Sequence, residues 1–136
     1  WLLTALPAVW FADSAAYFVG KAIGRTRLSP RLSPKKTWEG YLAGILAAGV
    51  GGAGLAALWG LAADPSGFRP AAGLWLGLAI GTLTPLGDLG ISMIKREVQV
   101  KDTGRLLPGH GGALDRMDSW LWAGVLGYCA ASVAVR

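Results

Sequence analysis

Charged residues and cysteine are both scarce in this sequence of 136 residues. Asp, Glu, Lys and Arg together make up 15% of the chain, against about 25% in an average soluble protein. Hydrophobic residues make up 53%, and the mean hydropathy is +0.44. This composition excludes an ordinary soluble domain and indicates an integral membrane protein. The single cysteine, Cys129, excludes an intrachain disulfide and a cysteine-based metal cluster.

The apolar residues gather in segments that approach or exceed the roughly 20 residues of a membrane helix. These segments are residues 1–20, 41–63, 71–94 and 119–135. The second segment carries no charge, whereas Asp13 interrupts the first and Asp88 the third. The 21 glycines suit close packing of helices in lipid. We therefore expect an all-α, polytopic transmembrane helical bundle of about four spans, which forms one membrane-embedded domain over residues 1–136.

Positive charge is concentrated in the two polar segments between these spans. Residues 21–39 contain six basic residues and residues 95–118 contain five, which is 11 of the 13 in the chain. Two spans separate the segments, so both segments are expected on the same side of the membrane. The positive-inside rule makes that side the cytoplasmic face of the inner membrane. Because this rule accounts for the net charge of +5, we expect no nucleic-acid partner.

The first basic segment has two interpretations. As a topology signal it would also touch anionic lipid, at about 1 kcal/mol per basic residue. That interpretation does not explain why SPKKTWEG, residues 33–40, stands directly at the start of the second span. Ser33 and Pro34 predict the N-cap and the first residue of that helix.

Residues 92–118, SMIKREVQVKDTGRLLPGHGGALDRMD, form a dense polar stretch between two apolar segments. So much charge beside a membrane is costly to keep unless it binds something charged, and phosphate groups with a divalent metal are the natural candidate. The turn PGHGG, residues 108–112, frees backbone N–H groups for phosphate, although it matches no Walker A pattern. His110 alone is more typical of a loop hydrogen bond than of catalysis.

Aspartates near one membrane boundary form a candidate metal site. Asp88 lies inside an apolar span, where a carboxylate costs roughly 2.5–3.5 kcal/mol and usually faces the interior. Asp115 and Asp118 are spaced to point the same way from the first turn of the fourth span. Three such carboxylates suit Mg²⁺, which completes its shell with substrate phosphates and water. Alternatively, Asp115 and Asp118 only favour a helix N-terminus, with Asp118 as the N-cap, and Asp88 pairs with a buried lysine.

Two further observations extend this candidate site. Ser92 and Lys95 follow Asp88 at helical spacing, so these side chains lie on one face that leads to the cytoplasmic surface. Asp13 lies close to the edge of its own span, where a carboxylate can either reach the surface or join the metal site.

The pattern S-x-x-K-R-x(4)-K-D-x-G-x(2)-L-P-x-H-G-G-x-x-D-R-x-D, from Ser92 to Asp118, resembles the signature of the phosphatidate cytidylyltransferase (CDP-diglyceride synthetase) family. D-x-x-A-Y-x-x-G at residues 13–20, S-P-K-K-T-W-E-G at residues 33–40 and G-D at residues 87–88 are similar to the family as well. The resemblance covers essentially the whole chain. Because family members are longer and have further spans before these motifs, we expect this chain to be the C-terminal part of such an enzyme.

The resemblance implies transfer of CMP from CTP to phosphatidic acid, giving CDP-diacylglycerol and pyrophosphate for phospholipid biosynthesis. It implies Mg²⁺ as the cofactor and leaves a second cation open. The residues implied for catalysis are Asp88, Lys95, Arg96, Lys101, Asp102, His110, Asp115, Arg116 and Asp118. Those implied for substrate binding are Ser33, Lys35, Lys36, Thr37, Glu39, Ser92, Pro108, Gly109, Gly111 and Gly112. The implied metal ligands are Asp88, Asp115 and Asp118, with Asp13 as an additional candidate.

The expected partners are CTP, phosphatidic acid and the lipid bilayer, and a homodimer is left open. Other functions stay open as well. The acceptor could be another lipid phosphate, such as a polyprenyl or archaeal ether-lipid phosphate, and a CTP-dependent lipid kinase fits residues 92–118 less well. From a different class, the chain could be a non-catalytic membrane module that binds anionic lipid or needs a partner chain.

Overall fold

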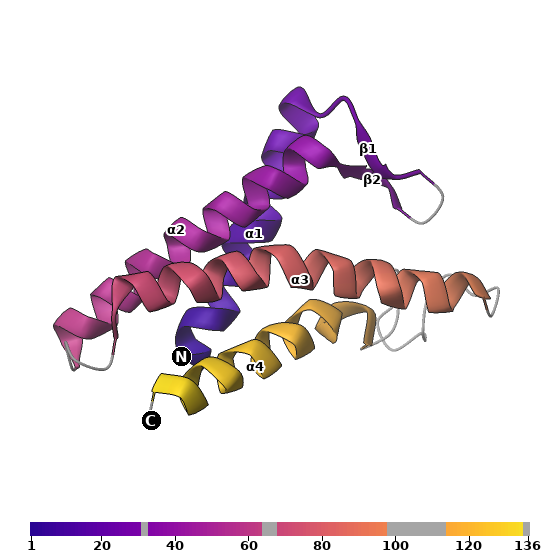
Figure 1. Cartoon of the computed structure of the whole chain (residues 1–136). Helices are drawn as coiled ribbons and strands as arrows, with labels where there is room; N and C mark the ends of the chain where they lie inside the picture. Colours follow the sequence, from indigo (N-terminus) through magenta and orange to yellow (C-terminus); the bar gives the residue numbers. More distant parts are fainter. Residues whose placement is uncertain (31–32, 64–67, 98–113, 135–136) are drawn as a thin grey trace.

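The computed structural model describes residues 1–30, 33–63, 68–97 and 114–134, which form four helices and a two-stranded hairpin (Figure 1). For residues 114–118 and 134 it describes the helical backbone alone. The elements follow in the order α1 (Leu2–Ile23), β1 (Arg27–Ser29), β2 (Ser33–Thr37), α2 (Trp38–Ala62), α3 (Pro70–Glu97) and α4 (Leu114–Ala134).

Within the described part of the chain, α1, α2 and α3 are long and apolar enough to cross a membrane, judged by length and composition. They contain 22, 25 and 28 residues, whereas roughly 20 span a bilayer. The apolar part of α4 is shorter and covers Ser119–Val133. The prediction of an all-α, polytopic membrane protein is therefore confirmed.

Polar or helix-breaking residues do not interrupt the spans. α1 continues past Asp13, and α3 continues past Pro85. An interior proline costs about 3 kcal/mol in a soluble helix, but packing against neighbouring helices makes it tolerable in a membrane protein. Asp88 consequently stays on the same helix as Ser92 and Lys95, as the sequence predicts.

Small residues bring the helices close together. α2 packs most extensively against α3 and α1, and its buried positions are all glycine or alanine. A Cβ atom at Gly52 would overlap with the carbonyl oxygen of Gly73 in α3, and one at Gly77 would overlap with that of Ala48 in α2. The backbones of α2 and α3 can approach this closely only because these positions are glycine.

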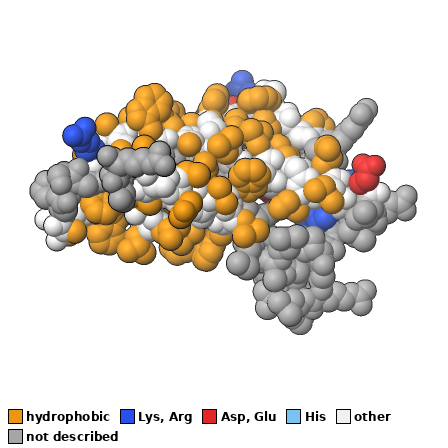
Figure 2. Space-filling view, turned by 60° about the horizontal axis from the view of Figure 1, so that its bottom comes forward, with side chains coloured by type: hydrophobic (Ala, Val, Ile, Leu, Met, Phe, Trp, Pro, Cys, Tyr) orange, Lys and Arg blue, Asp and Glu red, His pale blue; other side chains and the backbone are white. Residues whose placement is uncertain are grey.

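Large apolar side chains cover the outside of the bundle instead of filling its centre. The buried cluster joins α1, α3 and α4 and consists of Ala5, Ala8, Val9, Leu76, Ile80 and Ala123. Leu61, Trp75 and Val133, by contrast, are 88%, 71% and 75% exposed. Figure 2 shows hydrophobic side chains spread across the visible face, with the few charged ones toward its margins. This arrangement suits lipid as the surrounding solvent, since soluble proteins rarely expose apolar patches of this extent.

The segment between α1 and α2 folds differently from the prediction. β1 and β2 form an antiparallel hairpin, in which Arg27 lies opposite Thr37 and Ser29 lies opposite Ser33. Ser33 and Pro34 therefore belong to a strand, and the prediction that they start the second helix is wrong.

The start of α2 is set by Thr37 instead. Its Oγ1 accepts a hydrogen bond from the backbone N–H of Gly40 at 3.2 Å, and the helix begins at Trp38. A threonine in this position satisfies one of the free N–H groups of the first turn. Strand pairing holds the residues before Thr37 extended, so the cap falls at the end of β2.

The hairpin and the C-terminal end of α3 lie at the same end of the bundle (Figure 1). At the opposite end, the ring of Trp1 packs against that of Phe68, with centroids 5.4 Å apart. The described parts of the two predicted basic segments thus share one end of the molecule, which agrees with the charge-based topology.

Candidate functional site

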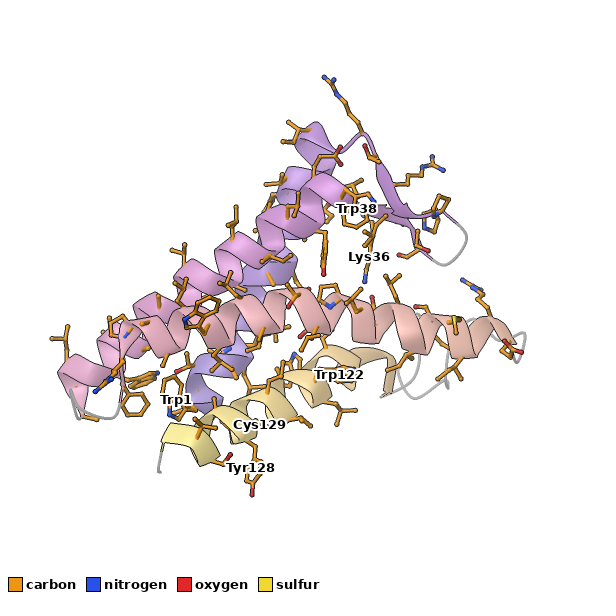
Figure 3. All side chains as sticks on the ribbon, in the orientation of Figure 1. Trp1, Lys36, Trp38, Trp122, Tyr128 and Cys129 are labelled. Atoms are coloured by element: carbon orange, nitrogen blue, oxygen red, sulfur yellow. The ribbon has the colours of Figure 1, made fainter. Side chains whose placement is uncertain are left out.

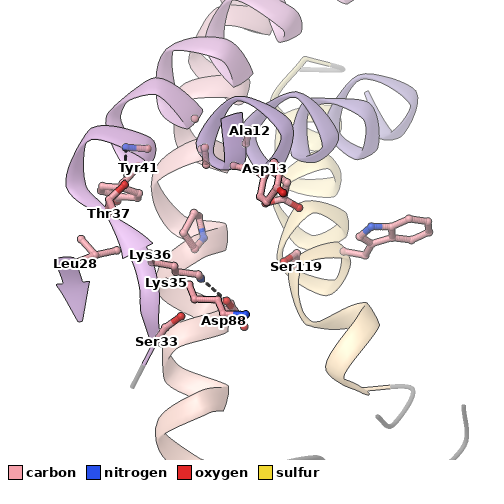
Figure 4. A pocket seen from close by; sticks show the side chains of 17 residues that line it. Ala12, Asp13, Leu28, Ser33, Lys35, Lys36, Thr37, Tyr41, Asp88 and Ser119 are labelled. Carbon is pink, nitrogen blue, oxygen red and sulfur yellow. Dashed lines mark hydrogen bonds and ion pairs between the residues drawn. The ribbon is translucent and has the colours of Figure 1, made fainter. Parts of the chain in front are cut away.

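A cavity of about 480 Å³ opens at this end, where all four helices and the hairpin contribute to its wall (Figure 4). Its described polar lining comes from β2 and from the four helices. The described polar and charged lining residues are Asp13, Tyr17, Ser33, Lys35, Lys36, Thr37, Tyr41, Asp88 and Ser119. Two lysines and two aspartates therefore face a space large enough for a small ligand at the end of the apolar bundle.

An ion pair crosses this cavity. The Nζ of Lys36 in β2 donates a hydrogen bond to Oδ2 of Asp88 in α3, 52 residues further along the chain. Lys36 extends from the hairpin toward α3 in Figure 3, and a dashed line marks the pair in Figure 4. The side chains are half-buried, at 31% and 30% exposure. The alternative in which Asp88 pairs with a lysine is confirmed for the pairing, with Lys36 as the partner, but this lysine is half-buried instead of buried.

Asp13 approaches the same pair from α1. It lines the cavity, and its carboxylate is close enough to interact electrostatically with both Lys36 and Asp88. Two carboxylates in one cavity repel each other unless a cation lies near them. The Lys36 ammonium supplies that positive charge.

Tyr41, near the start of α2, connects α2 to α3 beside the cavity. Its hydroxyl donates a hydrogen bond to the backbone carbonyl oxygen of Thr82 in α3 at 2.9 Å. The Thr82 hydroxyl in turn donates to the carbonyl oxygens of Leu78 and Ala79. Sequence reasoning missed Tyr41. The signal that could have identified this residue is its position directly after SPKKTWEG, one helical turn beyond Thr37.

Comparison with known proteins gives the family of this chain. A model of the cytidylyltransferase family matches residues 1–134. The chain belongs to this family. The resemblance inferred from the sequence motifs is therefore confirmed.

Curated members of the cytidylyltransferase family are similar to most of this chain. The phosphatidate cytidylyltransferases of Brucella suis, Synechocystis and Bacillus subtilis are 46%, 47% and 42% identical over 120, 126 and 125 residues. These matches cover 88%, 93% and 90% of this chain, but 42%, 41% and 44% of the relatives. The chain thus spans about two fifths of the length of the curated relatives it matches.

The cavity brings together part of the site that the family resemblance implies. The implied residues that line it are Asp13, Ser33, Lys35, Lys36, Thr37 and Asp88. Ser92, Lys95 and Arg96 lie further along α3, toward its C-terminal end, and are not among the described lining residues. Glu39 stands in the first turn of α2, and its carboxylate accepts a hydrogen bond from the backbone N–H of Thr26, just before β1.

The remaining implied residues have no described side chain. Lys101, Asp102, Pro108, Gly109, His110, Gly111 and Gly112 lie outside the described residues. Asp115, Arg116 and Asp118 belong to the first five residues of α4, of which the backbone is described. Because α4 begins at Leu114, the alternative that Asp118 is its N-cap is wrong. Ser119, the next residue, lines the cavity.

The donors in the cavity fit a magnesium ion. Among the residues that the structure describes, no group of three Asp, Glu, His or Cys side chains is arranged to hold a metal. Asp13 and Asp88 nevertheless place two carboxylates in one cavity. Mg²⁺ usually takes one or two carboxylates and completes its shell with water and substrate phosphates, and Asp13 and Asp88 are donors of this type.

Proposed function

We propose that this chain carries the catalytic site of a phosphatidate cytidylyltransferase, which transfers CMP from CTP to phosphatidic acid. The observation that carries the proposal is the cavity in which Lys35, Lys36, Asp13 and Asp88 meet at one end of the membrane helices. Family membership and the names of the relatives support it. A membrane-bound lipid phosphate and a soluble nucleotide can meet at such an end, and we place it on the cytoplasmic face of the inner membrane.

In the proposed reaction, a phosphate oxygen of phosphatidic acid attacks the α-phosphorus of CTP. A new P–O bond forms, the bond between the α-phosphorus and the oxygen that bridges to the β-phosphorus breaks, and pyrophosphate leaves with the bonding electrons. Such a reaction needs orientation and charge stabilisation more than covalent help from the protein. The ammonium groups of Lys35 and Lys36 can bind the phosphates and stabilise the charge of the departing pyrophosphate.

Bound Mg²⁺ would supply positive charge to the triphosphate oxygens. Asp13 and Asp88 would hold it, together with Asp115 and Asp118 near the start of α4. The basic residues at and beyond the end of α3 would add to triphosphate binding, and they are Lys95, Arg96, Lys101 and Arg116.

The experiment is an assay of pyrophosphate release by the purified chain in detergent. CTP, phosphatidic acid and Mg²⁺ are supplied together, and each is omitted in turn. We expect release only with all three. Asp88→Asn should lower the rate roughly a hundredfold or more, because a neutral amide can neither bind the cation as strongly nor balance Lys36.

Gly54→Ala provides the matched control, since a Cβ at Gly54 would meet no atom within 4 Å. The control should keep its full rate. Normal turnover by a folded Asp88→Asn variant would contradict the assignment of the site. A folded native chain that releases no pyrophosphate would contradict the proposal for this chain. The proposed reaction needs only one copy of the chain. Light scattering in detergent tests separately whether the chain forms a homodimer.

A further inference from the structure

Glu39 is expected from the sequence to bind substrate, but its carboxylate contacts the backbone of the hairpin segment. The N–H of Thr26, just before β1, donates to Oε1 and Oε2 of Glu39 at 3.1 and 3.3 Å. The neighbouring N–H of Trp38 donates to the carbonyl oxygen of Thr26 at 2.9 Å. The first turn of α2 thus holds Thr26 by both its N–H and its C=O group.

The hairpin depends on such attachments. β1 and β2 contain three and five residues, and a two-stranded hairpin alone is marginally stable at best. Thr37 anchors β2, because it packs against Gly20 and Gly24 at the end of α1. Directly before β1, the carboxylate of Glu39 attaches Thr26 to the first turn of α2.

The strand register connects this attachment to the cavity. Arg27 follows Thr26 directly and lies opposite Thr37, the residue after Lys36. Lys36 in turn extends from β2 to Asp88. A displacement of β1 from α2 would therefore shift β2 and move the Lys36 ammonium away from the cavity. Glu39 itself is not among the described residues that line the cavity.

We propose that Glu39 is a positioning residue for Lys36. Its carboxylate acts as a hydrogen-bond acceptor that fastens β1 to α2, and it thereby holds the Lys36 ammonium opposite Asp88. The effect on turnover rests on the proposed function, whereas the effect on the position of Lys36 does not.

Three substitutions of Glu39 in the full chain separate the effect of side-chain length from the effect of charge. Glu39→Gln keeps the length of the side chain and an acceptor oxygen but removes the charge. Glu39→Asp keeps the charge but shortens the side chain by one methylene, and Glu39→Ala removes both. For each variant, kcat and KM are measured by pyrophosphate release. The acylation of Lys36 by an amine-reactive reagent is quantified by mass spectrometry, with the exposed Lys35 as internal reference.

We expect Glu39→Gln to retain turnover within about threefold, because a neutral acceptor gives a weaker but similar hydrogen bond. Glu39→Asp and Glu39→Ala should lose roughly tenfold to a hundredfold in kcat/KM, since small displacements of a reacting group are this costly. In these two variants the acylation of Lys36 relative to Lys35 should rise severalfold, while in Glu39→Gln it should not.

The opposite order would overturn the proposal. If Glu39→Gln is as impaired as Glu39→Ala while Glu39→Asp works, Glu39 acts through its charge on substrate or metal. Normal turnover and unchanged Lys36 acylation in all three variants would also show that Glu39 positions nothing. A native chain without turnover, but with the expected order of acylation, would contradict the proposed function alone. If Glu39→Ala does not fold, the comparison of Glu39→Gln with Glu39→Asp tests the proposal by itself.

Discussion

The ion pair between Lys36 and Asp88 serves the charge of the cavity more than the stability of the fold. Its side chains keep 31% and 30% of their surface exposed, and pairs that solvent reaches contribute about 0–1 kcal/mol. At the site, however, the same ammonium faces two carboxylates and the proposed phosphates. Activity and stability should therefore respond very differently to its loss.

We predict that Lys36→Met lowers kcat/KM roughly a hundredfold and changes the free energy of unfolding by less than about 1 kcal/mol. Pyrophosphate release and denaturant unfolding in the same detergent check both values. Arg27→Met removes the same charge from an exposed position in β1 and serves as the control. A Lys36→Met variant that loses stability and activity together would contradict this division of roles.

The hydroxyl of Tyr41 serves the stability of the fold more than the activity, because it connects α2 to α3 beside the cavity. Tyr41→Phe removes the hydrogen bond to Thr82, and we predict a loss of about 1 kcal/mol in stability. Turnover should fall much less than in Lys36→Met. Unfolding measurements test this prediction against Tyr128→Phe, whose side chain is 72% exposed. Equal stability losses in both variants would show that the Thr82 bond contributes nothing specific.

At the scale of elements, the helices could be predicted and the hairpin could not. Long apolar runs require helices in a membrane, since every backbone polar group must be satisfied within its own segment. The strands at Arg27–Ser29 and Ser33–Thr37 are short, show no apolar–polar alternation and include Pro34. Their pairing depends on contacts with α1 and with the first turn of α2, and sequence alone does not reveal such tertiary contacts.

The contact between α2 and α3 yields a prediction with a control in the same helix. Gly52→Ala forces α2 away from Gly73, and we predict a destabilisation of about 1–3 kcal/mol, as for overpacked cores. Gly54→Ala, half a turn further along α2, meets open space and should leave stability unchanged or slightly raise it. Melting of both variants in detergent measures the difference. Similar melting temperatures would mean that the small residues are not what sets the distance between these helices.

At the scale of the whole molecule, the sequence motifs identified several residues that line the cavity, but they did not show which of these residues contact one another. Lys36 and Asp88 both stand in motifs of the family, and charge counting placed the two basic segments at one end. That Lys36 pairs with Asp88, and that Tyr41 and Ser119 line the same cavity, follows from how the helices cross. Crossing angles depend on packing of small residues along the helices, which a single sequence does not determine.

The orientation of the bundle in the membrane gives the final prediction. Arg27 in the hairpin and Arg69 before α3 are exposed at opposite ends of α2. In a Cys129→Ala background, a membrane-impermeant maleimide should label Arg27→Cys only from the cytoplasmic side of bacterial membranes, and Arg69→Cys only from the other side. Right-side-out vesicles expose the outer face of the membrane to the reagent, and inverted vesicles expose the cytoplasmic face. Labelling of both cysteines from one side would mean that α2 does not cross the bilayer. Labelling of Arg69→Cys from the cytoplasmic side and of Arg27→Cys from the other side would place the cavity where cytoplasmic CTP cannot reach it.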